Sequence, residues 1–272
     1  MGVVLITGCS SGFGLGSAVG FAKAGDRVYA SMRTPSKQGA LRDACEAAGV
    51  EVEVVQLDVT DDASVEDAVA GVISAEGRID VLVNNAGVGW LYAIETMPDD
   101  LLRQTFETNL FGTVRMLRAV LPHMRAQGSG TIVNVSSVAG HVPAPFTGFY
   151  PVTKHALRAM SESLSMEVED DGIKVALIEP GFYRTNILSD QDAEPVDPSS
   201  PYLNGETKTR EYWGSSVENG GDPQEICDLI VSVGRSADPP LHNLVDTDGW
   251  IPGRFALDDA GWAGLIRTTV GY

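Results

Sequence analysis

The 272-residue chain has few cysteines, few lysines and no long apolar run, and each shortage argues against a class of protein. Cys9, Cys45 and Cys227 lack the close spacing of a disulfide framework or a zinc knuckle. The four histidines show no metal-ligand spacing, so we expect no metal site. No run is long enough to span a membrane, and the first residues carry neither a basic segment nor a cleavage site. We therefore expect a cytoplasmic protein with no membrane partner.

Positive charge is also scarce. The chain has 19 Lys and Arg against 37 Asp and Glu, which gives a formal net charge of −18. Such a charge disfavours binding to nucleic acid or to an anionic membrane. The carboxylates are scattered rather than clustered, which is typical of a solvated surface. An anionic cofactor would therefore need locally positive groups.

Short β-branched runs alternate with longer helical patterns over the first two thirds of the chain. This alternation predicts βαβ units around a parallel sheet. We expect strands near residues 3–7, 27–31, 51–57, 81–84, 131–136 and 174–179. Apolar residues spaced by three and four predict helices near residues 12–24, 41–48, 63–76, 101–125 and 149–169. The fold class is therefore α/β, with a Rossmann-type doubly wound parallel sheet, helices on both faces and a single domain over residues 1–272.

The pattern breaks down after the predicted sixth strand. Residues 186–222 are rich in Asp, Pro, Ser and Gly, with the isolated aromatics Tyr202, Tyr212 and Trp213. A segment of that length is either disordered or a functional lid, and we favour a substrate lid. A helix near 223–233 and a short strand near 244–245 follow, whereas the pattern of residues 250–272 predicts no element.

The segment Thr7–Gly14 (TGCSSGFG) directly follows the first predicted strand and opens the first helix. Glycines at Gly8, Gly12 and Gly14 let the backbone turn sharply and approach a pyrophosphate, while free N–H groups and the helix dipole attract its charge. Ser10 and Ser11 add hydroxyl donors. The alternative is a glycine-rich turn without a ligand, but the position after the first strand favours a dinucleotide site.

Arg33 stands at the end of the second predicted strand, where a carboxylate would bind the adenosine ribose diol of NAD. A guanidinium can instead bind a 2′-phosphate with two hydrogen bonds. The residue therefore favours NADP(H) over NAD(H), although an exposed arginine is also common at a strand end.

The segment Tyr150-Pro-Val-Thr-Lys154 places a phenol and an ammonium on one face of a predicted helix. A neighbouring ammonium is expected to lower the phenol pKa, so that Tyr150 can act as a general acid and base. A surface tyrosine packed on a lysine stem is the alternative. Ser137 argues against it, because this hydroxyl ends the fifth predicted strand, where ligands bind in α/β sheets.

Two asparagine segments accompany this set. Asn109 lies in the middle of a predicted helix, where asparagine is unfavourable unless it is exposed or caps a helix. Its amide could anchor a water beside Lys154. Residues 84–87 (NNAG) end the fourth predicted strand and are either a plain turn or part of a cofactor site.

Together these segments and Pro180-Gly181 resemble the short-chain dehydrogenase/reductase family over residues 3–187, in the same order and spacing. The resemblance implies a seven-stranded parallel sheet and a catalytic tetrad of Asn109, Ser137, Tyr150 and Lys154. It also implies a set of cofactor-binding residues: Gly8, Ser10, Ser11, Gly12, Phe13, Gly14, Arg33, Asp58, Val59, Asn85, Ala86, Gly87, Tyr150, Lys154, Pro180, Gly181, Tyr183 and Thr185. Chemistry alone leaves open whether Asp58 contacts adenine or caps the next helix.

The chain departs from the family pattern at two positions. Pro151 replaces a small residue after the tyrosine, which a first helical turn tolerates. Ser11 stands where many NADP-preferring members carry a basic residue, so Arg33 remains the main residue that favours NADP(H) over NAD(H). The glycine loop and the Val-Tyr-Ala-Ser-Met-Arg strand resemble members that act on steroid- or retinoid-like alcohols and ketones. A hydrophobic pocket could include Trp90, Phe146, Phe149, Phe182 and the aromatics of residues 186–222.

The sequence thus predicts an NADP(H)-dependent oxidoreductase that transfers a hydride to or from a carbonyl or secondary alcohol carbon of a small hydrophobic molecule. Tyr150 is its acid–base group. The alternatives are an NADP-binding sensor or scaffold without catalysis, and a nucleotide-sugar epimerase, whose glycine spacing differs. The resemblance also implies a homodimer or homotetramer.

Overall fold

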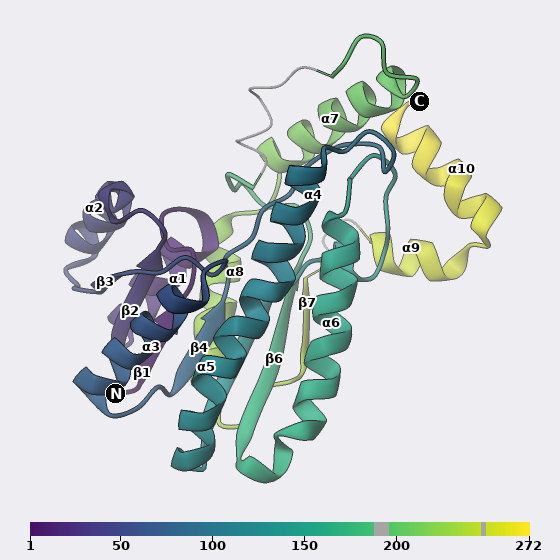
Figure 1. The fold of residues 1–272 in the computed structure, drawn as a ribbon. Helices are drawn as coiled ribbons and strands as arrows, with labels where there is room; N and C mark the ends of the chain where they lie inside the picture. The colour runs from purple at the N-terminus through teal and green to yellow at the C-terminus, as the bar shows by residue number, and fades with distance from the viewer. Residues whose placement is uncertain (188–195, 246–248) are drawn as a thin grey trace.

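The computed structural model describes residues 1–187, 196–245 and 249–272. They contain a seven-stranded, fully parallel sheet in the order β3-β2-β1-β4-β5-β6-β7 (Figure 1). The strands are β1 (Val3–Ile6), β2 (Arg27–Met32), β3 (Glu53–Gln56), β4 (Val81–Asn84), β5 (Gly130–Val135), β6 (Ile173–Pro180) and β7 (His242–Val245). The strand order reverses between β1 and β4, and this reversal opens a crevice beyond the carboxyl ends of the strands. The predicted Rossmann-type fold is confirmed.

Helices cover both faces of the sheet. The described α-helices are α1 (Gly12–Lys23), α2 (Gly39–Ala48), α3 (Asp62–Glu76), α4 (Asp99–Phe106), α5 (Gly112–Gln127), α6 (Tyr150–Glu167), α7 (Leu203–Glu218), α8 (Pro223–Arg235), α9 (Trp250–Ala256) and α10 (Asp259–Val270). Buried residues of α1, α2 and α8 form one hydrophobic core with the sheet, and those of α3, α5 and α6 form the other.

The central strands are buried on both faces, which explains their continuous apolar sequence. In β1, Val4 and Ile6 belong to the core under α1 and α8, whereas Val3 and Leu5 belong to the core under α3 and α5. Successive side chains of a strand point to opposite faces, so a run without polar residues fills both cores. Packing in these two cores fixes the position of the carboxyl ends of the strands, where the candidate active site lies.

The long helix expected over residues 101–125 is interrupted. A π-helical turn, η2 (Glu107–Phe111), separates α4 from α5 and contains the buried Asn109. A π-turn widens the helix by one residue and often occurs at functional sites. The amide of Asn109 hydrogen-bonds outside the helix, which accounts for an asparagine inside a helical stretch.

The last third contains more structure than its composition indicates. Residues 186–222 were expected to be irregular, but Leu203–Glu218 form α7; residues 188–195 lie outside the described part. The predicted helix near 223 and the strand near 244 are confirmed as α8 and β7. The tail, for which no element was predicted, forms α9 and α10, and Figure 1 shows α10 (yellow) beside α7 (green) beyond the end of the sheet.

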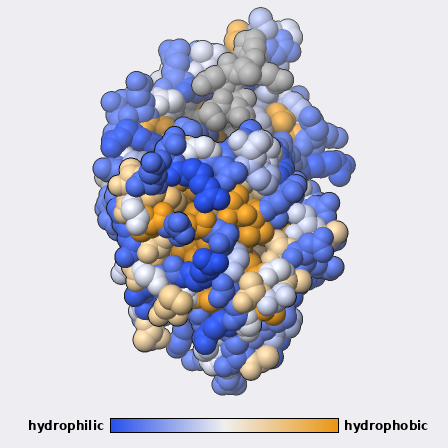
Figure 2. Space-filling model, turned by 90° about the vertical axis from the view of Figure 1, so that its left-hand side faces the viewer, coloured by the Kyte–Doolittle hydropathy of each residue, from blue (hydrophilic) through white to orange (hydrophobic). Residues whose placement is uncertain are grey.

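The described helices include none that is long and apolar enough to cross a membrane. Figure 2 shows the side of the molecule that carries α2 and β3 in Figure 1. Its surface is mostly hydrophilic, in keeping with the charge of −18, but hydrophobic residues gather at its centre.

Candidate active site

One cleft of about 390 Å³ lies at the carboxyl ends of the strands. It extends from Arg33 at the end of β2, which we call its outer end, to residues of α10 at its inner end. The residues predicted to bind the cofactor and those predicted to act on the substrate therefore line one cavity. Eighteen of the residues predicted from the sequence line it: Gly8, Ser10, Ser11, Gly12, Phe13, Arg33, Asp58, Val59, Asn85, Ala86, Gly87, Ser137, Tyr150, Lys154, Pro180, Gly181, Tyr183 and Thr185. Gly14 and Asn109 do not line the cleft.

The glycine-rich turn after β1 is shaped by close backbone contacts. Gly8 has a φ of +73° and Gly12 a φ of +57°, which favour glycine. A Cβ atom on Gly14 would lie 2.4 Å from the Gly8 carbonyl oxygen, so this position needs a glycine for packing although it does not face the cleft. The Asn85 side-chain amide donates hydrogen bonds to the carbonyls of Thr7 and Gly8, at 2.9 and 3.1 Å. The turn is therefore held rigidly against the segment after β4.

Arg33 and Asp58 lie at the outer part of the cleft. Arg33 is exposed, and within the described residues its guanidinium makes no hydrogen bond or ion pair. The Asp58 carboxylate accepts hydrogen bonds from the Thr60 backbone N–H (3.0 Å) and hydroxyl (2.7 Å). The residue that caps α3 is Asp61, which accepts from Ser64 N–H, so Asp58 is not the cap of that helix.

Ser137 and Tyr150 meet in the inner part of the cleft. Ser137 begins a short 3-10 turn, η3 (Val138–Gly140), and its hydroxyl accepts a hydrogen bond from the Ala139 N–H at 3.1 Å. The same hydroxyl donates to the Pro180 carbonyl at 3.4 Å, and it lies near enough to the Tyr150 phenol to act on its pKa in the lowering direction. Tyr150 is the first residue of α6, with Pro151 in the first turn, where a proline costs no hydrogen bond.

The pKa of Tyr150 differs from the expectation. Burial raises it to about 12, because a charged phenolate is poorly stabilised away from water, although the hydrogen bond with Ser137 acts in the lowering direction. The Lys154 Nζ lies 5.5 Å from the centre of the Tyr150 ring and donates a hydrogen bond to the Val135 carbonyl at 2.8 Å. Burial also lowers the pKa of Lys154 to about 8. The predicted lowering of the tyrosine pKa is therefore wrong for this structure, because desolvation of the phenol outweighs the lowering effect of Ser137.

Asn109 fixes two segments of the site to each other. Its Oδ1 accepts from the Val88 N–H, and its Nδ2 donates to the Val88 carbonyl, both at 2.8 Å. The second hydrogen of Nδ2 is donated to the Thr153 hydroxyl on α6 at 3.1 Å. The segment after β4 is thereby attached to the helix that carries Tyr150 and Lys154. A water beside Lys154 stays a prediction.

Aromatic side chains form the wall beyond Tyr150. The Phe182 ring contacts Trp213 and Tyr212 with centroid distances of 4.9 and 6.2 Å. Tyr212 in turn contacts Trp250 at 6.3 Å, and Trp250 contacts Trp262 at 5.9 Å. All five rings, together with Trp90, line the cleft. Its inner end is therefore apolar.

Three aromatics expected in this pocket lie elsewhere. Phe146 packs on Tyr202 and on Tyr272 at the end of the chain, with centroid distances of 6.1 and 5.2 Å. Phe149 packs on Phe106 at 6.1 Å. Phe146, Phe149 and Tyr202 therefore do not line the cleft.

Helix α7 is fixed to the segment that follows Trp90. The buried carboxylate of Glu206 accepts hydrogen bonds from the Ala93 N–H (2.8 Å) and from the Thr96 hydroxyl (2.6 Å). One turn further along α7, the Arg210 guanidinium lies 5.3 Å from the centre of the Tyr92 ring. The helix is thus tied to a loop more than 100 residues earlier in the chain.

Residues 2–195 match the short chain dehydrogenase family. The chain belongs to this family. It is 42% identical over 234 residues to the uncharacterized oxidoreductase YusZ of Bacillus subtilis, covering 84% of this chain and 82% of that protein. It is 35% identical to human 17-beta-hydroxysteroid dehydrogenase type 1, with 97% and 83% covered, and 37% identical to bovine retinol dehydrogenase 8, with 90% and 81% covered.

Solved structures of short-chain dehydrogenases share the fold of this family member. One from Streptomyces avermitilis has a TM-score of 0.81 and 33% identity, and 99% of this chain and 97% of that chain are covered. A Burkholderia phymatum enzyme solved with NAD has a TM-score of 0.80 and 25% identity, with 94% and 92% covered. A metagenomic enzyme solved with NADP has a TM-score of 0.71 and 27% identity, with 90% and 96% covered. Similar proteins thus bind either nucleotide.

Several residues that line the cleft of this short-chain dehydrogenase were missed by sequence reasoning. Four of them belong to the C-terminal helices: Trp250, Trp262, Ile266 and Val270. The apolar spacing of Trp262, Ile266 and Val270 is four residues and could have indicated a helical face. Gln104 and Thr108 also line the cleft, and nothing in their local sequence distinguishes them from surface residues.

Proposed function

We propose that this short-chain dehydrogenase transfers a hydride between NADP(H) and a carbonyl or secondary alcohol carbon of an uncharged hydrophobic molecule. The observation that carries the proposal is the meeting of the Tyr150 phenol with the buried Ser137 hydroxyl and the buried Lys154 amine in one cleft, between the glycine-rich turn and the aromatic wall. Polar groups that converge on one point of an apolar cleft are typical of an active site.

The residues at the outer end suit a dinucleotide. The turn at Gly8 and Gly12 has the backbone angles that bring N–H groups close to a pyrophosphate, and it stands at the start of α1. The guanidinium of Arg33, which has no partner among the described residues, can bind a 2′-phosphate and thus favours NADP(H). When bound, the nicotinamide would donate or accept the hydride.

The residues at the inner end suit proton transfer. With a pKa of about 12, Tyr150 keeps its proton at neutral pH and can donate it to a developing alkoxide in the reductive direction. Ser137 is placed to donate a hydrogen bond to the same substrate oxygen. Lys154, with its pKa near 8, can be charged or neutral close to physiological pH and stabilises the phenolate when charged.

The inner end also supports the substrate class. Aromatic rings surround it, and the charged residues lining the described part of the cleft are Arg33, Asp58 and Lys154, the first two of them at the outer end. A charged group among the aromatic rings beyond Tyr150 would lose its hydration without an ionic partner in the wall. A hydroxysteroid dehydrogenase and a retinol dehydrogenase are among its relatives, which favours steroid- or retinoid-like alcohols and ketones.

Initial rates with NADPH and NADH over a panel of apolar ketones test the proposal. We expect turnover, faster with NADPH, and a loss of about 10³-fold in kcat for Tyr150→Phe with the NADPH Kd within about twofold. A Tyr150→Phe enzyme that keeps most of its rate would refute the acid–base role. Tight cofactor binding without turnover would indicate a sensor, and turnover of a nucleotide sugar would indicate an epimerase.

A further inference from the structure

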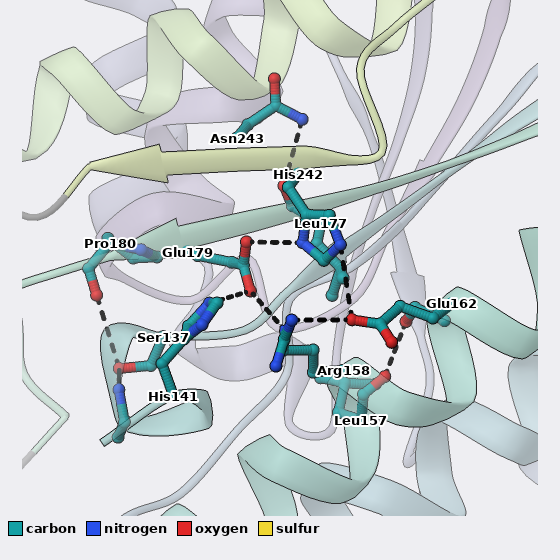
Figure 3. A network of polar contacts seen from close by, with 12 residues as sticks. Ser137, His141, Leu157, Arg158, Glu162, Leu177, Glu179, Pro180, His242 and Asn243 are labelled. Carbon is teal, nitrogen blue, oxygen red and sulfur yellow. Dashed lines mark hydrogen bonds and ion pairs between the residues drawn. The ribbon is translucent and has the colours of Figure 1, made fainter. Parts of the chain in front are cut away.

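Glu179, at the carboxyl end of β6, has a fully buried carboxylate that takes no part in the proposed reaction. Its Oε1 lies 2.7 Å from His141 Nε2, and its Oε2 lies 3.0 Å from His242 Nδ1 (Figure 3). Arg158 Nε lies 3.9 Å from Oε1. A buried carboxylate is costly unless its oxygens are paired, so each of these contacts matters for the placement of the residues that make it.

The partners of Glu179 differ in their relation to the active site. His141 directly follows the turn η3, which begins at Ser137, and Arg158 lies on α6 eight residues after Tyr150. His242, by contrast, lies on β7, none of whose residues lines the cleft. The same carboxylate therefore bonds to one histidine that adjoins the turn of Ser137 and to one on a strand outside the cleft, whose Nε2 also lies 3.4 Å from Glu162 on α6.

The turn that carries Ser137 is bonded to β6 at both of its ends. At the start, the Ser137 hydroxyl donates to the carbonyl of Pro180 at 3.4 Å. At the finish, the His141 ring is bonded to the side chain of Glu179, the residue before Pro180. Between them, the Gly140 N–H donates to the Ser137 carbonyl at 2.9 Å, so the turn is short and stiff. Figure 3 shows the two attachments side by side.

We propose that the hydrogen bond between His141 and Glu179 fixes the orientation of η3, and thereby holds the Ser137 hydroxyl against Tyr150. His141 is thus a positioning residue that acts through Ser137, and the inference rests on the proposed function. Without this bond the start of the turn stays attached to β6 through the Ser136 N–H, which donates to the Ile178 carbonyl at 2.7 Å, and through the 3.4 Å contact of Ser137. The end of the turn loses its side-chain bond to β6, so that the turn can tilt and carry the Ser137 hydroxyl away from the phenol. Small displacements of a catalytic group reduce rates strongly.

A double-mutant cycle on kcat with NADPH and an apolar ketone tests this role. We expect His141→Leu to lower kcat about tenfold in the wild-type background, with the NADPH Kd unchanged. In a Ser137→Ala background the same substitution should lower kcat by less than about twofold, because the group that it positions is already absent. An equal loss in both backgrounds would overturn the proposal.

His242→Leu is the matched control, because it removes a hydrogen bond to the same buried carboxylate. We expect the two leucine variants to lower the thermal midpoint to a similar extent, while His242→Leu keeps kcat within about twofold of the wild type. His141→Gln retains an N–H donor and should recover most of the rate. If His242→Leu loses as much rate as His141→Leu, the effect is one of general stability and the proposal fails.

Two outcomes remain distinct. If the wild type turns over no ketone in the panel, the proposed function fails and the inference fails with it. If the wild type is active and the cycle is additive, only the role of His141 is refuted. Should His141→Leu not fold, Glu179→Gln replaces it in the cycle, because glutamine keeps the shape of the side chain. The loss of kcat is again compared between the wild-type and the Ser137→Ala backgrounds, and an equal loss in both would overturn the proposal.

Discussion

The two ends of the cleft are built in different ways. At the outer end, backbone atoms of consecutive residues shape the site, and the permitted side chains are few because a Cβ atom on Gly8 or Gly14 would collide with the neighbouring chain. At the inner end, side chains from α7, α9 and α10 converge, and each is held by ring contacts of 4.9 to 6.3 Å. The comparison indicates that the outer end tolerates little change, whereas the inner end can be altered one ring at a time.

The largest effect should follow a change in the backbone-built end. In Gly14→Ala, the new Cβ would lie 2.4 Å from a carbonyl oxygen and 2.5 Å from the Asn85 amide nitrogen. Overpacking of this kind costs about 2 to 3 kcal/mol, so we expect NADPH to bind about 30- to 150-fold more weakly in a fluorescence titration. Gly71→Ala is the matched control: this glycine of α3 has nothing within 4 Å of the Cβ position, and cofactor affinity should not change.

The next effect concerns cofactor choice. Arg33→Ala removes the guanidinium proposed to bind the 2′-phosphate, and charge-assisted hydrogen bonds are worth about 2 kcal/mol. We expect the ratio of kcat/KM for NADPH over NADH to fall about 20-fold, with the NADH value nearly constant. Arg42→Ala on α2, whose guanidinium is bonded to Gln38 and the Val52 carbonyl, serves as a control for loss of surface charge. An unchanged ratio would remove the basis for NADP preference.

A smaller effect is expected at the side-chain-built end. Trp213→Leu removes one ring of the wall and its contact with Phe182, and such a change in an apolar pocket is worth about 1.4 kcal/mol. The KM for a large apolar ketone should rise about tenfold while the NADPH Kd stays the same. Phe255→Leu provides the control, since this ring on α9 is 75% exposed. Equal KM changes in both variants would mean that the wall does not contact substrate.

The smallest effect lies at the junction of the two ends. Because burial places the pKa of Lys154 near 8, well below its ordinary value, the folded protein binds fewer protons than the unfolded one between about pH 8 and 10. Stability should therefore rise with pH in that range. Relative to Lys154→Met, we expect the cofactor-free wild type to gain about 1 kcal/mol between pH 7.5 and 9, read from denaturant unfolding. A parallel pH dependence in both proteins would show that the amine is not desolvated.

The outer end could be predicted from the sequence because its chemistry is local. Gly8 and Gly12 directly follow a strand and open a helix, and the strand order then fixes where Arg33 must lie. Tyr150 and Lys154 were placed by their spacing. Spacing does not give the balance between burial and charge, however, so the direction of the Tyr150 pKa was predicted wrongly.

The remaining features depend on contacts between distant segments. His141 and Glu179 are 38 residues apart, and nothing in either local sequence pairs them. The rings of Trp250 and Trp262 reach the cleft only because α9 and α10 fold back over the end of the sheet (Figure 1). The segment assigned as an irregular lid contains α7, because its buried Glu206 and Thr209 pack inside the molecule instead of facing solvent.

The attachment of α7 has a consequence for access to the cavity. If α7 alone moved away from Ala93 and Thr96, the Glu206 carboxylate would lose its two shortest hydrogen bonds and keep only the 3.4 Å contact with the Ser200 hydroxyl among the described residues. A movement of α7 that keeps these hydrogen bonds therefore requires the 91–97 loop to move with the helix. Any widening of the apolar end of the cleft by a movement of α7 would therefore also move a segment more than 100 residues earlier in the chain.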